Sequence, residues 1–381
     1  MNDSDPDPEA WYPVAPPSPR KGRGAVTNLQ GRYEVDQRET FDDGWQQPAH
    51  DETDADSASA LRTQVFTEYA KSILTRNQSP DIPFTVSLNP YRGCEHGCIY
   101  CFARPTHSYL GLSPGLDFES RIYAKVNAPE LLVRELSKPS YEPEPIALGV
   151  NTDAWQPAER ELRLTRRVLE VLHERRHPFA AITKSSLIER DLDLLVPMAE
   201  RRQVIAAVTI TTLDADIART LEPRAATPSR RLRTIRTLAD AGVPVGVSIA
   251  PVIPFVTEPD LERVLDACAQ AGATSASYIV LRLPWEVAPL FRDWLSAHFP
   301  DRADRVMSRV RDMRGGKDYD SSFAQRMKGT GLWADLLKQR FHNAVRRLGL
   351  NERHHGILDM SQFSRAKPPP DRPPNPQMKL F

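Results

Sequence analysis

Three of the four cysteines of this chain lie within eight residues, at Cys94, Cys98 and Cys101. Thiolates three and four positions apart in a tight loop can bind one metal centre, and Gly93 and Gly97 give the backbone freedom to wrap it. In a reducing compartment such clustered thiols bind metal or do chemistry more often than they form disulfides. The spacing therefore indicates a metal site.

The loop offers three ligands, whereas a structural zinc site is closed by four. Zinc would need a fourth ligand from His96, His107 or the distant Cys268, and the chain has no second Cys-x-x-Cys. A four-iron cluster held by three cysteines instead leaves one iron with an open position, where a ligand can bind and be reduced. The missing fourth cysteine favours the cluster, and zinc is the alternative.

The elements that must position this loop alternate between strand and helix. Six apolar runs of strand length are expected at 82–88, 145–150, 178–183, 204–211, 243–252 and 275–283. Segments of helical period lie between or after them, at 128–137, 157–175, 186–201, 228–242, 258–271 and 286–297. This alternation predicts an α/β fold with a parallel sheet, either curved into a full or partial barrel or laid open.

Polar residues follow the predicted strands repeatedly. The cysteine loop follows the first strand, Asn151-Thr152-Asp153 the second and Lys184 the third. Thr209 lies at the end of the fourth strand, and Arg282 lies at the end of the sixth. Both β/α architectures carry their chemistry at the carboxyl ends of the strands, so we expect one site at this rim.

The cysteine pattern, with Tyr100 as the aromatic residue before the third cysteine, resembles the signature of the radical S-adenosylmethionine (SAM) superfamily. The resemblance covers roughly residues 82–300 and implies a partial (β/α)6 TIM-type barrel, which agrees with the six strands. Further stretches are similar to the spore photoproduct lyase branch and its uncharacterised bacterial relatives. These stretches are Ile182–Lys184, Leu221–Pro223, Arg230–Leu232, Ile249–Pro254, Arg23–Ala25 and Arg326–Gly331.

The resemblance implies a [4Fe–4S] cluster bound by Cys94, Cys98 and Cys101, with SAM chelating the fourth iron. It also implies that Tyr100 lies near the adenine and that Lys184 pairs with the SAM carboxylate. Thr152 is implied to contact the methionyl amino group, at a position where many relatives have Gly-Gly-Glu. Thr209 is implied to contact the ribose, and Glu222 and Arg224 are implied to form a supporting ion pair. A flavodoxin- or ferredoxin-type reductant is the implied electron donor.

One position departs from the lyase. The hydrogen-donating cysteine of that enzyme corresponds to Val150 here, so reversal of a thymine dimer by the same route is unsupported. Cys268 is expected to be a small buried hydrophobic residue in a helix. Tyr278 and Tyr123 are alternative hydrogen donors, but nothing in the sequence selects either.

The formal net charge of zero conceals an asymmetry along the chain. Residues 1–60 contain 13 acidic and five basic residues, a net charge of −8, so the remaining 321 residues carry +8. We expect a mostly disordered, acidic, proline-rich arm at 1–60, in which the basic patch Arg20–Ala25 could dock on the body. The radical SAM core is expected at 61–300. No run approaches the roughly 18 apolar residues of a membrane helix, so we expect no membrane partner and a cytoplasmic location.

Beyond residue 300 the chain is rich in arginine, which predicts a basic, mainly helical extension at 301–365. Its helix near 332–348 carries Lys338, Arg340, Arg346 and Arg347 outside the apolar stripe. Such a face is either solvated or binds nucleic acid. A proline-rich tail at 366–381 ends in Gln377-Met378-Lys379-Leu380-Phe381, which resembles the peptide by which bacterial replication and repair proteins bind the sliding clamp.

The sequence thus predicts a radical SAM enzyme that cleaves SAM reductively to a 5′-deoxyadenosyl radical. Nucleic acid is the favoured substrate, as in DNA repair or base modification. One alternative is radical modification of a protein or small metabolite. The alternative of another class is a non-catalytic iron–sulfur or zinc adaptor that binds DNA.

Overall fold

The fold is known from a computed structural model, which describes residues 19–34, 61–323, 325–352 and 358–365. Most of the predicted acidic arm and the clamp-like peptide with Gln377, Leu380 and Phe381 lie outside the described residues. None of the helices in the described ranges combines the length and apolar character that a membrane span requires.

The main sheet has seven strands, six of them parallel. In spatial order they are β10 (Ser275–Val280), β9 (Val245–Val252), β8 (Val204–Thr209), β7 (Phe179–Thr183), β6 (Ile146–Leu148), β3 (Val86–Leu88) and β2 (Leu74–Arg76). β2 is antiparallel to β3, and β10 and β2 form the two edges. The sheet is therefore not closed, and the predicted six-stranded partial barrel is confirmed.

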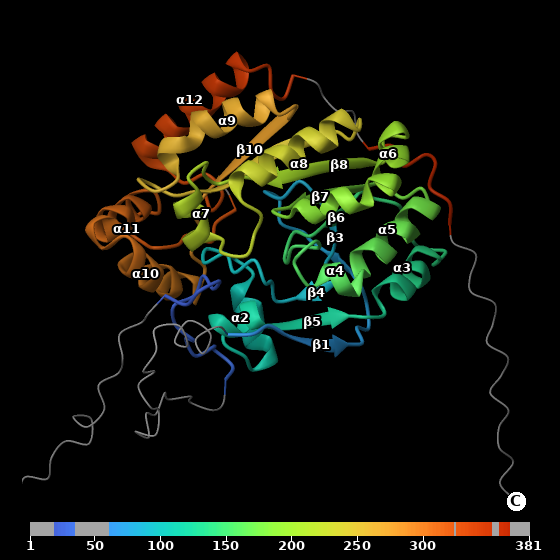
Figure 1. Cartoon of the computed structure of the whole chain (residues 1–381), viewed down its shortest axis with the longest axis horizontal. Coiled ribbons are helices and arrows are strands. Elements are labelled where there is room, and N and C mark those ends of the chain that lie inside the picture. Colours follow the sequence, from blue (N-terminus) through green and yellow to red (C-terminus); the bar gives the residue numbers. More distant parts are fainter. Residues whose placement is uncertain (1–18, 35–60, 324, 353–357, 366–381) are drawn as a thin grey trace, which may run out of the picture.

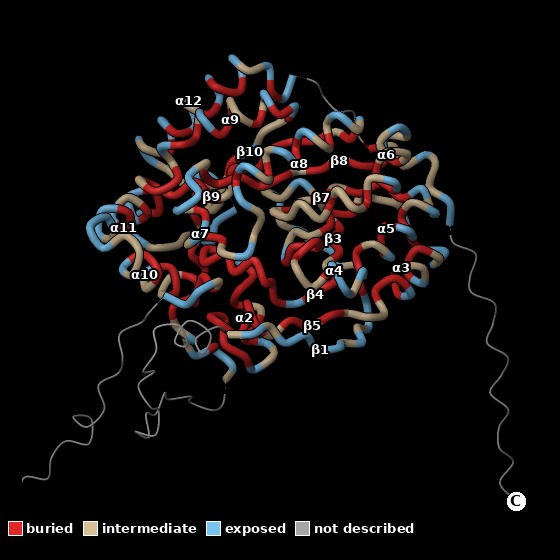
Figure 2. The backbone as a smooth tube through the Cα atoms, in the orientation of Figure 1, coloured by how far each residue is buried: buried red, intermediate tan, exposed pale blue. Residues whose placement is uncertain are grey.

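Helices follow the parallel strands and cover the outside of the sheet (Figure 1). They are α3 (Ala128–Leu136), α4 (Glu159–Leu162), α5 (Leu164–Glu174), η3 (Ser186–Asp191), α6 (Leu192–Glu200), α7 (Ala215–Leu221), α8 (Pro228–Asp240), η4 (Glu258–Asp260), α9 (Leu261–Gln270) and α10 (Val287–His298). Figure 2 shows the inner strands of the main sheet as largely buried, with the exposed helix faces outside.

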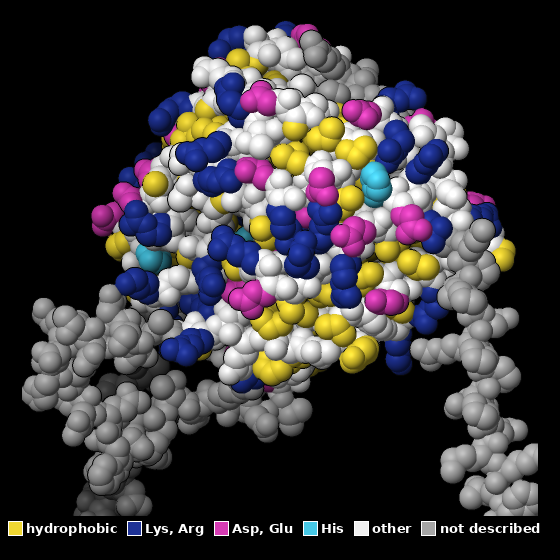
Figure 3. Space-filling view, turned by 45° about the vertical axis from the view of Figure 1, so that its right-hand side comes forward, with side chains coloured by type: hydrophobic (Ala, Val, Ile, Leu, Met, Phe, Trp, Pro, Cys, Tyr) yellow, Lys and Arg dark blue, Asp and Glu magenta, His cyan; other side chains and the backbone are white. Residues whose placement is uncertain are grey.

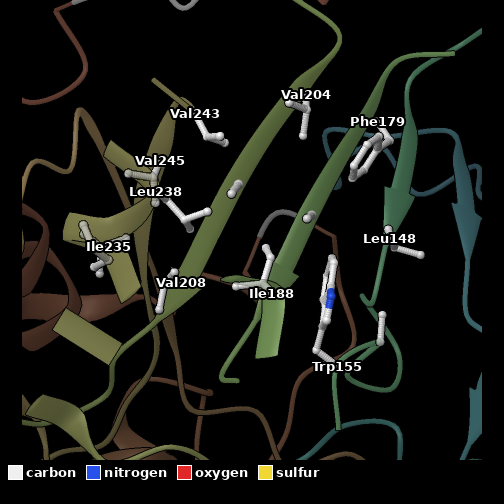
Figure 4. Packing of buried hydrophobic residues seen from close by; sticks show 14 of the residues in the cluster. Leu148, Trp155, Phe179, Ile188, Val204, Val208, Ile235, Leu238, Val243 and Val245 are labelled. Atoms are coloured by element: carbon white, nitrogen blue, oxygen red, sulfur yellow. The ribbon is translucent and has the colours of Figure 1, made fainter. Parts of the chain in front are cut away.

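The main core lies between the sheet and these helices. Figure 4 shows Val204 and Val208 of β8 and Phe179 of β7 in one cluster with Ile235 and Leu238 of α8. All five side chains are fully or almost fully buried. Alternate residues of a strand point to opposite faces, so these large side chains fill the outer layer and leave the inner face free for a site.

One helix predicted as continuous is split in two. The segment at 157–175 forms α4 and α5, separated by Arg163 in a left-handed conformation with φ of +51°. The buried carboxylate of Glu159 accepts hydrogen bonds from the backbone N–H groups of Thr165 (2.9 Å) and Arg166 (3.1 Å). This side chain satisfies the free donors at the start of α5, which makes the break favourable.

A second, smaller sheet that the sequence patterns did not reveal has the order β1 (Gln64–Glu68), β5 (Arg121–Lys125), β4 (Tyr91–Arg92). β4 directly precedes Gly93, so this sheet fixes the start of the cysteine loop. After the loop come η2 (Arg104–Leu110) and α2 (Leu116–Ser120).

The extension after residue 300 contains η5 (Pro300–Arg302), α11 (Ala303–Asp312) and α12 (Gly331–Arg347). α11 packs on α10, and α12 packs on α9, as Figure 1 shows at the left and top. Between α11 and α12 the chain returns to the sheet, where the carbonyl of Met327 accepts a hydrogen bond from the N–H of Val280 (2.9 Å).

Candidate active site

A cavity of about 910 Å³, open to solvent, lies at the carboxyl ends of the parallel strands. The lining residues come from the loops after β3, β6 and β7 and from the ends of β8, β9 and β10. They include Cys94, Cys98, Cys101, Lys184 and Thr209. The rim predicted from polar residues at strand ends is therefore one continuous wall.

Two glycines allow the cysteine loop to turn as tightly as it does. Gly93 and Gly97 have φ values of +75° and +66°, in the left-handed region that side chains with a Cβ disfavour. A Cβ on Gly97 would also lie 2.8 Å from a carboxylate oxygen of Glu119. Successive turns, closed by N–H groups of Gly97 and Cys101 donating to the carbonyls of Cys94 (3.3 Å) and Cys98 (3.2 Å), place all three thiols on the cavity.

The chemistry of this donor set fits an iron–sulfur cluster. Burial raises the pKa of Cys98 to about 12. Lys184 lowers this pKa and Glu222 raises it, so their effects oppose each other. Burial also raises the pKa of Cys94. These thiols become ligands only when a metal supplies the positive charge that favours thiolates. Three soft sulfur donors on one loop suit iron in a cluster and leave one iron free for another ligand.

Within the described residues, no three His, Cys, Asp or Glu side chains converge on a point as the ligands of a single ion do. The thiolates of a cubane cluster each bind a different iron. Of the three candidates for a fourth zinc ligand, His96 lines the cavity. His107 Nε2 is 3.0 Å from the carbonyl of Arg121, and Cys268 is buried in the main core, as expected for a small hydrophobic residue.

The underside of the cysteine loop rests on a buried arginine. Arg104 donates from Nε to the carbonyl of Cys98 (2.9 Å) and from Nη2 to the carbonyl of Gly97 (3.0 Å). The same guanidinium pairs with Glu119, and both side chains are fully buried. Because buried charges are favourable only when paired and hydrogen-bonded, this network fixes the loop carbonyls in one arrangement.

The N-terminal segment 19–34 completes this support. Its Gly24 and Ala25 donate backbone N–H groups to the carboxylate of Glu119 (2.9 and 2.8 Å), and Arg23 donates to the Glu119 carbonyl (2.7 Å). A Cβ on Gly24 would lie 1.9 Å from the carbonyl oxygen of Gly97. The basic patch at Arg20–Ala25 thus docks directly on the cysteine loop, and Figure 1 shows this segment in dark blue beside α2 and α10.

Lys184 and Asp153 form the polar wall beside the loop. The Asp153 carboxylate accepts hydrogen bonds from the N–H of Lys184 (2.7 Å) and the hydroxyl of Thr183 (2.8 Å), and it lies 3.3 Å from His96 Nδ1. Burial acts to raise the pKa of Asp153, but His96 and the backbone donors outweigh it and lower the pKa. Burial acts to lower the pKa of Lys184, but its acidic neighbours Glu222 and, when it is a thiolate, Cys98 raise it overall. Lys184 therefore stays a cation, with Nζ 5.7 Å from the centre of the Tyr100 ring.

A second buried ion pair braces Tyr100 and Thr209. The Tyr100 hydroxyl donates to the Glu222 carboxylate, whose other oxygen binds Arg231. Arg231 also donates to the carbonyl of Thr209 (2.9 Å). Burial acts to raise the pKa of Glu222, but Arg231 and Lys184 lower it, so the carboxylate is charged.

The predicted Glu222–Arg224 ion pair is wrong. Glu222 pairs with Arg231, and Arg224 pairs with Glu95 at 3.1 Å on the outer side of the loop. Arg231 is 1% exposed, whereas Arg224 is exposed, so the nearer arginine in sequence is not the one that reaches the buried carboxylate. The sequence signal for Arg231 was its place in the stretch Arg230–Leu232, which is similar to the lyase branch.

Thr152 is not brought to the cavity. Its hydroxyl donates to the carbonyl of Tyr91 (3.0 Å), while its neighbours Asn151 and Asp153 line the wall. Val150 does line the cavity. The alternative hydrogen donors lie elsewhere: the Tyr278 ring packs 4.6 Å from Phe341 of α12, and the Tyr123 ring stacks 5.2 Å from Phe66 of β1.

Comparison with known proteins identifies a family and several similar proteins. The family model described as "Radical SAM superfamily" matches residues 88–268. An uncharacterized protein of Mycobacterium tuberculosis is 37% identical over 234 residues, which cover 61% of this chain and 68% of that protein. An uncharacterized protein of Methanocaldococcus jannaschii is 23% identical over 223 residues, 58% of this chain and 80% of that protein. A solved structure of spore photoproduct lyase with a dinucleoside spore photoproduct matches with a TM-score of 0.48 and 14% identity, over 75% of this chain and 80% of that one.

Proposed function

Because the chain belongs to the radical SAM superfamily, we propose that it acts on a nucleic acid by radical chemistry inside the cysteine-lined cavity. It is an enzyme whose family uses a [4Fe–4S] cluster and SAM, so the non-catalytic adaptor is no longer an alternative. The family also needs a reductant, for which a flavodoxin- or ferredoxin-type protein is our proposal.

A reduced cluster held here would supply the electron for reductive cleavage of SAM to methionine and a 5′-deoxyadenosyl radical, which would abstract a hydrogen atom from the substrate. In our proposal Cys94, Cys98 and Cys101 hold the cluster. Lys184 binds the SAM carboxylate as a point charge, for which its raised pKa is suited. Thr209 contacts the ribose, and Tyr100 lies by the adenine, both braced through Arg231.

The observation that carries this assignment is the convergence of separate elements on one cavity. The three thiols come from the loop after β3, Lys184 from the end of β7 and Thr209 from the end of β8. The residues are up to 115 positions apart in the chain, from Cys94 to Thr209. A structural metal loop would need no such charged and polar companions on a shared open wall.

Anaerobic reconstitution tests the chemistry. We expect about four irons per chain and release of 5′-deoxyadenosine on reduction with SAM. Cys98→Ala is expected to lose both, whereas Cys268→Ala, which removes a thiol buried in the core outside the cavity, is expected to keep both. Colourless protein holding one zinc, or a Cys98→Ala variant that still releases 5′-deoxyadenosine, would contradict the assignment.

The sequence resemblance to the spore photoproduct lyase branch supports nucleic acid as the substrate class. Exposed aromatic side chains on the N-terminal segment, on η2 and after β10 also support it. The Tyr33 and Tyr109 rings stack at 5.2 Å, and the Arg32 guanidinium, which also pairs with Glu286 at 2.6 Å, lies 4.4 Å from the centre of the Trp285 ring. All three rings are more than half exposed. Such rings beside cations suit stacking on bases, and an extruded base could then enter the cavity.

The basic face of α12 gives less support than the sequence indicated. Arg340 binds Glu262 and Glu258 of the neighbouring segment, and Arg347 binds Asp266 (2.9 Å). Two of its four basic side chains are therefore neutralised by acids around α9. Figure 3 shows the same mixture on one face of the molecule, where basic side chains border acidic ones.

Binding to nucleic acid at several salt concentrations separates the substrate classes. A phosphate-bound complex weakens steeply with salt, because each neutralised phosphate releases a counterion. Absent or salt-insensitive binding, together with intact SAM cleavage, would instead favour a protein or small metabolite as substrate. That outcome would leave the radical chemistry in place.

We also propose the sliding clamp as a partner of the tail. Leu380 and Phe381 are two apolar anchors on a proline-rich tether, and Gln377 can fix their register in a groove. The test is retention of the full chain on immobilised clamp, compared with a chain lacking Leu380 and Phe381. Equal retention of the two proteins would remove the proposal.

A further inference from the structure

Arg282 lies where the two ends of the open sheet come close together at the cavity. It lies in the loop after β10, the edge strand farthest in the sheet from β3, yet it lines the same cavity as the cysteine loop that follows β3. Its guanidinium carbon is 5.3 Å from the centre of the Phe102 ring. Phe102 follows Cys101 directly, so the curvature of the sheet brings Arg282 next to the cluster site.

No carboxylate pairs with Arg282 among the described residues. Its Nη1 makes one weak polar contact, with the thioether sulfur of Met327 at 3.4 Å, and its buried Nε has no hydrogen-bond partner. Neighbouring arginines have more partners: Arg326 binds Asp81 through two contacts, and Arg314, whose Nε also has no partner, donates from its Nη atoms to three carbonyl oxygens. Asp81, whose pKa the charge of Arg282 also helps to lower, is thus already bound by Arg326.

A buried donor without a partner is unfavourable, and proteins retain few of them. An anion that enters the cavity would supply the missing acceptors, and the planar guanidinium fork suits phosphate oxygens in particular. The carboxylate of SAM is the other anion at this site, and Lys184 is placed for it. Arg282 is therefore available to the substrate.

Phe102 adds a second element of recognition. It is 44% exposed and lines the cavity, with Arg282 against its ring. An exposed aromatic ring at a cavity mouth offers a surface on which a base can stack, whatever its identity. An arginine beside such a ring places a charge where the phosphate of the same or the next nucleotide would lie.

We propose that Arg282 and Phe102 form the substrate subsite, in which Arg282 binds a phosphate and Phe102 stacks on the adjoining base. The subsite rests on the proposed function, because it presumes a nucleic acid substrate. It adds the two side chains that recognise the substrate, neither of which binds the cluster or SAM.

The test uses the full chain, reconstituted and bound to SAM, with a fluorescein-labelled single-stranded 12-mer of mixed sequence followed by anisotropy. Arg282→Gln is expected to weaken binding roughly tenfold and to reduce the salt slope by about one. Phe102→Leu is expected to weaken binding roughly tenfold with the salt slope unchanged. The matched control is Arg236→Gln, which removes one exposed arginine whose partner is the carbonyl of Gln270, at the opposite end of the barrel.

Iron content and SAM binding are measured on every variant. Equal binding of the 12-mer by wild type and Arg282→Gln would overturn the subsite and leave the proposed function intact. Loss of SAM binding in Arg282→Gln would assign this arginine to SAM and overturn it too. A further outcome is that an acidic peptide of equal charge competes as well as unlabelled 12-mer, and only when Arg282 is present. That result would overturn the phosphate assignment and identify the anion bound by Arg282 as a carboxylate. A wild-type protein that cleaves SAM but never binds the 12-mer would remove the nucleic acid proposal and the subsite together.

Discussion

Substitution of Gly24 tests whether the docked N-terminal segment positions the cluster ligands. The Cβ of Gly24→Ala would lie 1.9 Å from the carbonyl oxygen of Gly97, where real contacts stay beyond 3.0 Å. The two backbones must therefore separate by about 1 Å. Gly24 has no positive φ, so the substitution itself adds no backbone strain.

The clash can be relieved in two ways, which differ in their free-energy cost. Detaching the segment would break two N–H bonds to the charged Glu119, and hydrogen bonds to charged groups contribute about 1.5–3 kcal/mol each. Keeping the segment docked and overpacking the contact costs about 1–3 kcal/mol in total. Overpacking is cheaper, so we expect the segment to stay bound and to displace the carbonyl of Gly97 between Cys94 and Cys98.

The assay compares iron per chain, thermal stability and 5′-deoxyadenosine release. Gly24→Ala is expected to lose about 1–3 kcal/mol of stability and to hold less iron than wild type. The control is Gly22→Ala, where φ is +73° and nothing lies within 4 Å of the added Cβ. It costs about 1–2 kcal/mol of backbone strain without touching the loop. If the two variants were equally destabilised and both held wild-type iron, the segment would be a stabilising contact only.

Three further outcomes follow from the buried charges. Arg231→Met leaves Glu222 without its main counter-charge and should destabilise the protein by about 3–5 kcal/mol in thermal denaturation, and adding Glu222→Gln should recover part of that loss. Lys184→Met should weaken SAM binding, measured by equilibrium dialysis, at least about tenfold, and Lys184→Arg should weaken it less. Burial lowers the pKa of His177 to about 4, so below about pH 6.5 the unfolded chain takes up a proton that the folded chain excludes. Stability should therefore fall as the pH drops from 6.5 to 4, and His177→Gln, which can still accept from the Tyr141 hydroxyl, should flatten that fall.

The repeating part of the fold could be predicted from periodicity, because each parallel strand is an apolar run followed by an amphipathic helix. The small sheet could not. β4 has two residues, and β1 exposes Val65 and Phe66, so neither shows the burial pattern of a core strand. Their pairing depends on contacts between distant segments, such as Gln64 beside Arg121, which local sequence does not encode.

In the candidate site, the sequence predicted which residues at strand ends line the cavity better than it predicted their ion-pair and hydrogen-bond partners. Lys184 and Thr209 reach the cavity because the end of a strand fixes where its last side chains point. Thr152 does not, because neighbouring loop residues point in different directions, and its neighbours Asn151 and Asp153 face the cavity instead. Arg224 does not, because it pairs with Glu95. The support from Glu119 and Arg104 was missed, since a buried ion pair looks in sequence like any two surface charges.

The two halves of the cavity differ in how completely their charges are satisfied. Around the cysteine loop, Arg104, Glu119, Glu222 and Arg231 are buried and paired, and this rigidity suits ligands whose geometry must not vary. At the β10 side, Arg282 keeps a buried donor without a partner. A site that holds one fixed cofactor gains from completed ion pairs, whereas a charged group without a counter-charge suits a variable anionic ligand. If the proposed subsite is correct, this asymmetry separates the part of the cavity that sets the type of chemistry from the part that selects the substrate.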